Sequence, residues 1–179
     1  IITDHHTCKD RLPTAAEAIL NPKRPDCDYP FDALAGVGVA FKLILALAIK
    51  NGLKTTDVFN QYVDIATLGT IADVVPLLGE NRVIVDKGLK ILHNPKRIGI
   101  RAIMEVAGVL DKPLNASTIA FSIAPRLNAA GRLGSAATAV ELLLTNDESR
   151  ARELALLLDT ENKERQQTER QIFDEALEL

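Results

Sequence analysis

Apolar residues return every three or four positions along most of this chain, and this spacing predicts a largely helical protein. It predicts helices over residues 14–20, about 37–50, 55–66, 80–94, 98–107 and 136–144, and a longer one from Asn146 or Asp147 onward. Thr14 and Glu17 have the spacing of a capping box. The opening Ile1-Ile2-Thr3 departs from the helical pattern and predicts the end of a buried strand.

The last predicted helix changes character along its length. Its first turns carry an apolar stripe at Ala151, Leu154, Leu157 and Leu158, but from Asp159 onward the stripe almost vanishes. Opposite charges then follow at i,i+4 spacing, which supports a solvated helix. A long helix that is polar nearly all round is typical of a connection between two domains.

Length and composition suit a globular protein with a substantial core. The chain has 179 residues, 47% of them apolar and 25% charged, and a net charge of −3. Such a charge gives no general attraction to nucleic acid, so any such binding must rest on a local patch. Two cysteines make no disulfide framework and fit a reducing cytosol, and no apolar stretch is suited to span a membrane. The ends fall inside a predicted strand and a predicted helix, as expected for a piece of a longer protein.

The first candidate site follows the opening strand, where Asp4-His5-His6 ends the apolar run. Ligands of open α/β sheets bind beyond the carboxyl ends of strands. A carboxylate and two imidazoles suit Mn²⁺, Zn²⁺ or Fe²⁺ better than Ca²⁺. The alternative is a group of ordinary polar residues at the surface. His5 and His6 should point to opposite sides unless the strand has already ended.

Two further stretches carry candidate residues. Asp73 is the single charge between residues 65 and 79, so as a buried carboxylate it should be paired or bound to a cation, unless it caps a turn before Pro76. Around Pro125, which should break any helix, Arg126, Asn128 and Arg132 lie among small residues. Arginine forks suit phosphate, although Arg132 could instead pair with a nearby acid. The helix that follows, with Ser135 as its expected cap, would present its N-terminus to an anion.

Together, Thr3-Asp4-His5-His6, the segment 69–77 (GTIADVVPL) and the segment 126–132 (RLNAAGR) resemble the DHH phosphoesterase superfamily. Within it the chain is similar to the RecJ branch, the single-stranded-DNA-specific 5′→3′ exonucleases. The resemblance implies an α/β fold: the latter part of a parallel-sheet catalytic domain, mostly helical here, ending in a long interdomain helix. Residues 1–145 would then be the C-terminal part of the DHH domain. Residues 146–179 would lead toward a DHH-associated domain.

The resemblance also implies roles for individual residues. His5 and Asp73 would bind metal, and Asp4 would either bind it or orient His5. His6 would face the scissile phosphate, and Arg132, with Arg126 and Asn128, would contact nucleic acid. The expected cofactors are two Mn²⁺ or Mg²⁺ ions, whose remaining ligands would lie outside this chain, so that the chain alone should be inactive.

The same resemblance sets the expected partners and the alternatives. A monomeric cytoplasmic enzyme of DNA recombination and repair is expected, with single-stranded DNA as substrate and a helicase and single-strand-binding protein as possible partners. One alternative is a relative that cleaves short oligonucleotides or cyclic dinucleotides. Another is a non-catalytic replication scaffold of the same fold, although such scaffolds have generally lost the metal ligands that this chain retains.

Overall fold

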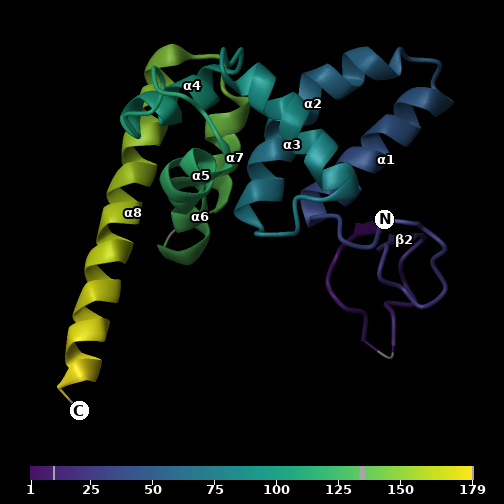
Figure 1. Cartoon of the computed structure of the whole chain (residues 1–179), viewed down its shortest axis with the longest axis horizontal. Helices are drawn as coiled ribbons and strands as arrows, with labels where there is room; N and C mark the ends of the chain where they lie inside the picture. Colours follow the sequence, from purple (N-terminus) through teal and green to yellow (C-terminus); the bar gives the residue numbers. More distant parts are fainter. Residues whose placement is uncertain (10, 134–135, 179) are drawn as a thin grey trace. The chain divides into compact units, whose positions relative to one another are not determined.

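The computed structural model describes residues 1–9, 11–133 and 136–178, with Arg132 and Leu133 described by their backbone alone. It is mostly helical and contains a small parallel sheet (Figure 1). The strands are β1 (Ile2–Thr3) and β2 (Ile19–Leu20). The helices are α1 (Gly36–Lys50), α2 (Thr55–Ala72), α3 (Gly79–Leu92), α4 (Ile98–Val106), α5 (Ala116–Thr118), the π-helix η1 (Ile119–Ile123), α6 (Ala124–Leu133), α7 (Ala136–Leu144) and α8 (Glu148–Leu177).

The two strands pair in parallel, with Ile2 opposite Ile19 and Thr3 opposite Leu20. The strand predicted at the start of the chain is therefore confirmed, although Ile1 is exposed and Ile2 only half-buried. The helix predicted over residues 14–20 is wrong, because its last two residues form β2. A helix of seven residues gains little from its few hydrogen bonds, whereas strand pairing gives the same backbone a partner.

The first unit of the chain packs α1, α2 and α3 around an apolar core. Its buried members are Leu34, Val39, Phe41, Val63, Ala66 and Ile84. Gly69 of α2 allows α1 to approach closely, since a Cβ there would lie 2.7 Å from Cγ1 of Val37. The helix predicted through residue 66 continues to Ala72, and it thereby carries the apolar stretch toward Asp73.

The loop after α2 is tightly constrained. Val74 has a φ of 57°, a left-handed conformation that a β-branched residue rarely adopts. Asn81, which is fully buried, donates from Nδ2 to the carbonyl oxygens of Pro76 at 3.0 Å and Ala33 at 2.6 Å. These two bonds tie the loop to the segment before α1, and they hold the strained turn in place.

In the second unit, Pro125 does not break the helix as predicted. It is the second residue of α6, directly after the π-helix η1. Inside a continuous helix a proline lacks one N–H donor, and its ring needs room beside the carbonyl of the preceding turn, which the wider π turn before Pro125 gives. The wider π turn ends as Ala124 donates its N–H to the carbonyl of Ile119. The segment 116–133 is therefore helical throughout, and the arginines lie on a helix.

The long polar helix is confirmed as α8, with Asp147 as its cap accepting from the N–H of Arg150. Its buried stripe contains Ala151, Leu154, Ala155 and Leu158, while Leu157, which was expected there, is 47% exposed. Beyond Arg165 its described residues are exposed. Despite this length, no helix in the described part of the chain is long and apolar enough to cross a membrane.

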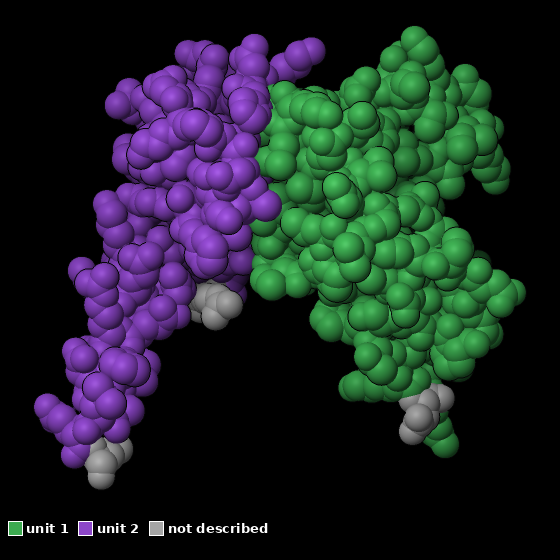
Figure 2. Space-filling view, viewed as in Figure 1, with its two compact units in different colours: residues 1–92 green, residues 93–179 purple. Residues whose placement is uncertain are grey.

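The chain divides into two compact units, Ile1–Leu92 and His93–Leu179, coloured separately in Figure 2. The first contains the sheet and α1 to α3, and the second contains α4 to α8. The mostly helical architecture with a parallel sheet and a long final helix agrees with the fold class expected from the sequence. The domain boundary expected after residue 145 stays a prediction.

Gly99→Ala should destabilise the second unit. A Cβ at Gly99 of α4 would lie 1.7 Å from the carbonyl oxygen of Leu142 in α7, a backbone atom that side-chain motion cannot relieve. We expect a loss of about 1 to 3 kcal/mol, measured by faster hydrogen exchange of α7 amides in the intact protein. Glu105→Ala, on the exposed face of α4, is the control. Unchanged exchange in Gly99→Ala would contradict the close α4–α7 packing.

Candidate metal centre

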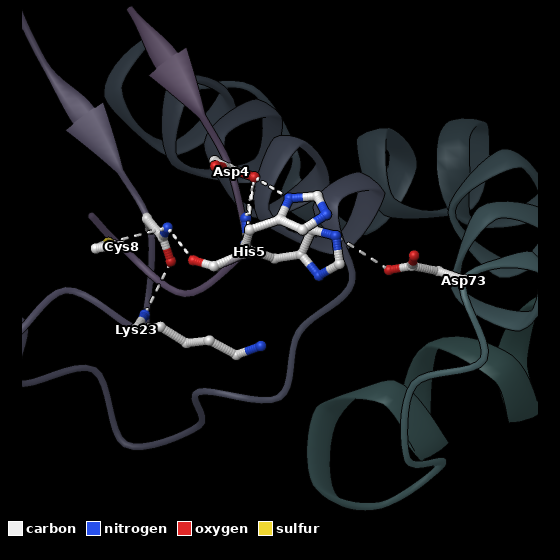
Figure 3. Close-up of polar contacts among 7 residues, drawn as sticks. Asp4, His5, Cys8, Lys23 and Asp73 are labelled. Atoms are coloured by element: carbon white, nitrogen blue, oxygen red, sulfur yellow. Dashed lines mark hydrogen bonds and ion pairs between the residues drawn. The ribbon is translucent and has the colours of Figure 1, made fainter. Parts of the chain in front are cut away.

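Asp4, His5 and His6 form one cluster directly after β1. One ligand atom from each lies within 4.8 Å of the other two. The strand ends at Thr3, so the alternation of side chains has stopped and the two imidazoles lie side by side, with ring centroids 4.4 Å apart. The condition under which both histidines could serve one site is therefore met (Figure 3).

Asp4 organises this turn through one carboxylate oxygen. Its Oδ1 accepts from the ring Nδ1 of His6 at 2.8 Å, and from the backbone N–H groups of His5 at 2.7 Å and His6 at 3.3 Å. The His6 contact and these backbone bonds lower the pKa of Asp4 to about 2. Asp4 therefore orients the ring of His6 and not, as expected, that of His5. Because all three bonds end on Oδ1, Oδ2 is the oxygen that could bind a cation.

The ring of His5 also contacts the end of α2. Its Nε2 lies 3.3 Å from Oδ2 of Asp73, a contact that Figure 3 shows between the strand end and the helix. The ring is only 15% exposed, and it rests against Gly36, where a Cβ would lie 3.2 Å from its Cδ2. Gly36, the first residue of α1, therefore makes room for a candidate ligand.

Asp73 is not buried, contrary to expectation. It is the C-terminal cap of α2, its backbone N–H donates to Gly69, and its side chain is 37% exposed. The prediction failed because an apolar stretch of sequence was assumed to be buried along its whole length. The stretch is helical as far as Ala72, and Asp73, the next residue, lies at the surface. An exposed carboxylate needs no partner to stay ionised, so its approach to His5 is a geometric fact and not a consequence of burial.

These four residues fit a divalent cation. Two carboxylates and two imidazoles are a donor set suited to Mn²⁺ and its neighbours. Two ligands at right angles, each about 2.1 Å from one ion, are about 3 Å apart, and His5 Nε2 and Asp73 Oδ2 are 3.3 Å apart. The structure thus brings Asp73 to His5, and it places His5 in one cluster with Asp4 and His6.

One residue near the cluster was misread from the sequence. Asn21 was interpreted as the end of a helix, yet it is 5% exposed and donates from Nδ2 to the carbonyl oxygen of His6 at 2.9 Å. The available signal was its position: it directly follows the short apolar pair Ile19-Leu20, as Asp4 follows Ile2 and Thr3.

The other three predicted site residues belong to the second unit and are described there by themselves. Arg126 of α6 donates from Nε to Oδ1 of Asp159 at 2.8 Å and from a guanidinium nitrogen to the carbonyl of Ser122. Asn128 is exposed on the same helix. Arg132 lies near the end of α6, and its side chain, like Ser135, is outside the described part of the structure. The fork of Arg126 is thus occupied within the protein.

Comparison with known proteins agrees with this geometry. Residues 1–70 match the model of the DHH family, N-terminal domain. The single-stranded-DNA-specific exonuclease RecJ of Bacillus subtilis (strain 168) is 45% identical over 179 residues, which cover 100% of this chain and 22% of the relative. The chain spans between about a fifth and a third of the length of the curated relatives it matches.

Solved structures give the same result. The crystal structure of exonuclease RecJ bound to manganese superposes with a TM-score of 0.85 at 38% identity, over 97% of this chain and 42% of that one. RecJ of Thermus thermophilus in complex with Mg²⁺ gives 0.78 at 39% identity, over 90% of this chain and 25% of that one. The chain is thus similar to the DHH family in residues 1–70. Over its whole length, the chain resembles RecJ.

Arg126→Ala should act on stability. Burial by itself would raise the pKa of Asp159, but bonds from Lys163 and Arg126 outweigh it and hold that pKa below its usual range. Removing Arg126 leaves the buried carboxylate of Asp159 with Lys163 but without its arginine partner, which should lower the free energy of unfolding by about 1 to 3 kcal/mol. Thermal unfolding of the intact protein measures this loss, with exposed Arg152→Ala as control. An unchanged melting temperature together with weaker DNA binding would show that Arg126 contacts phosphate instead.

Proposed function

We propose that this chain is part of a metal-dependent exonuclease that hydrolyses phosphodiester bonds of single-stranded DNA from the 5′ end. The observation that carries the proposal is the approach of His5 to Asp73 beside Asp4 and His6, on a fold shared with RecJ. The relatives are named as single-stranded-DNA-specific exonucleases, and two of the similar structures hold manganese or magnesium.

Each residue of the cluster has a defined part in the proposal. His5, Asp73 and Oδ2 of Asp4 would hold Mn²⁺ or Mg²⁺, and further ligands of a two-metal site would come from outside this chain. Ions bound there would activate water and stabilise the charge that develops on the phosphodiester. His6, whose ring is 78% exposed and bonded to Asp4 through Nδ1, would present Nε2 to the scissile phosphate.

The low pKa of Asp4 suits this role. A carboxyl group with a pKa of about 2 is ionised throughout the neutral range. A carboxylate must be deprotonated to bind a metal ion. Asp4 meets this condition and can bind a cation without first releasing a proton. Because Nδ1 of His6 is bonded to Asp4, Nε2 is the ring nitrogen that would hydrogen-bond to phosphate.

The wider setting is proposed on the same basis. Residues 1–145 would complete a catalytic domain, and residues 146–179, including α8, would lead to a further domain that helps hold the nucleic acid. Free Cys8 and Cys27 are consistent with a cytoplasmic protein. The proposed enzyme acts as a monomer in DNA recombination and repair, with a helicase and single-strand-binding protein as partners. The retained candidate ligands Asp4, His5, His6 and Asp73 and the identities to RecJ favour this over a scaffold or an enzyme of short oligonucleotides or cyclic dinucleotides.

Asp73→Asn tests the proposed activity. In the intact protein, release of nucleotides from 5′-labelled single-stranded DNA should require Mn²⁺ or Mg²⁺ and stop on chelation. The substitution removes a charged ligand and should lower the rate by at least about 100-fold, more than loss of an outer-shell partner usually does. Asp57→Asn, an exposed aspartate on the same helix, is the control. Near-normal turnover by Asp73→Asn would reduce this residue to a helix cap.

Arg132→Ala tests the contact with nucleic acid. If Arg132 binds a phosphate, its removal should weaken single-stranded DNA binding and flatten the log–log salt dependence by about one unit. Arg126→Ala is the matched comparison on the same helix, since its fork already binds Asp159 and it should leave the slope unchanged. An unchanged slope in Arg132→Ala together with lost thermal stability would mean that Arg132 pairs with an acid in the protein.

A further inference from the structure

The side chain of Asn21 uses all of its hydrogen-bonding groups on the segment around the candidate metal centre. Its Nδ2 donates to the carbonyl oxygen of His6 at 2.9 Å and to Sγ of Cys8 at 3.3 Å. Its Oδ1 accepts from the backbone N–H of Lys23 at 2.9 Å. These bonds join the amide to the turn after β1 and to the loop after β2, where Figure 3 labels Cys8 and Lys23. A buried side chain with this many partners has one possible orientation.

The position of Asn21 explains what these bonds do. The last backbone bond of the parallel ladder runs from the N–H of Asp4 to the carbonyl of Leu20 at 3.0 Å. Asn21 is the next residue after Leu20, and its side-chain amide continues the hydrogen bonding between the two segments beyond the last backbone bond. It reaches two residues further along the opposite chain, to the carbonyl of His6. The turn that carries the cluster is thereby held from both sides, by the ladder at Asp4 and by the amide at His6.

The geometry points to Asn21 as a positioning residue for the candidate metal centre, which fixes the backbone of His6 and with it the mutual arrangement of the Asp4, His5 and His6 side chains. This inference rests on the proposed function, because the cluster is taken to bind metal. Asn21 makes no contact with the reacting atoms itself. Aspartate lacks the N–H donors, and leucine of similar size lacks every polar group. Neither can replace the bond to the carbonyl of His6.

The test measures metal binding and cleavage separately in the intact protein. Asn21→Asp and Asn21→Leu are titrated with Mn²⁺, the free ion being followed by electron paramagnetic resonance. Cleavage and binding of single-stranded DNA are measured at saturating Mn²⁺. Both variants should bind Mn²⁺ about 10- to 100-fold more weakly, as loss of an outer-shell partner does. KM for DNA should change less than twofold, because Asn21 does not face the substrate.

The aspartate variant is informative because two effects have opposite signs. An added negative charge near the cluster would strengthen cation binding, whereas loss of the donor to His6 should weaken it. Weaker binding in Asn21→Asp therefore reports lost positioning. Asn51→Asp is the matched control: Asn51 also donates from Nδ2 to a backbone carbonyl, that of Leu47, at 2.7 Å, at the far end of α1. It should bind Mn²⁺ as the unchanged protein does.

The possible outcomes separate this inference from the proposed function. If the unchanged protein binds Mn²⁺ and cleaves DNA but both Asn21 variants match it, the positioning role is overturned while the proposed function stands. If both variants lose their circular dichroism signal, Asn21 is needed for folding and the positioning role is also overturned. If the unchanged protein binds no Mn²⁺, both fail. Weaker Mn²⁺ binding by folded variants, with KM unchanged, is the result that supports it.

Discussion

The parallel pairing of β1 with β2 is the constraint on which the candidate site depends. It involves two residues from each strand, yet it brings two chain segments to an end at the same edge. Asp4 and Asn21 are the first residues beyond that edge. Asp4 is the first residue of the cluster Asp4-His5-His6, and the side-chain amide of Asn21 donates to the backbone carbonyl of His6. Parallel strands end together by geometry, so groups distant in sequence meet there.

The second half of the site depends on helix packing. Gly69 lets α2 lie close against Val37 of α1, and Gly36 at the start of α1 leaves space for the ring of His5. As a result, Asp73 at the C-terminal end of α2 lies close to His5. The left-handed Val74 that follows is a strained residue, and strain of this kind persists only where the surroundings determine the conformation. Here the two bonds from buried Asn81 provide that restraint.

Helices of this chain could be predicted from residue spacing because each buries an apolar stripe, and Asp4, His5 and Asp73 could be singled out because carboxylates and histidines are rare in apolar surroundings. Most of what failed depends on neighbours that lie far away in the sequence or on a local backbone form that residue spacing does not show. Residues 14–20 have helical spacing, but Ile19 and Leu20 gain a distant partner in β1. Pro125 was read without the π-helix before it. The pairing of Arg126 with Asp159, and the bond from Asn21 to His6, join positions whose proximity only the fold creates.

The two units differ in the charge of their candidate site residues, which are acidic in the first unit and basic in the second. Around His5 the first unit places Asp4, already ionised by its own hydrogen bonds, and Asp73, exposed at a helix end. Two carboxylates on either side of one imidazole repel each other, and a divalent cation relieves that repulsion while using the same lone pairs. The second unit carries the arginines, but Arg126 is neutralised by Asp159. Arg132 stays the residue of the second unit that is predicted to contact nucleic acid. The candidate cation ligands thus belong to the first unit, and the predicted nucleic-acid contact belongs to the second.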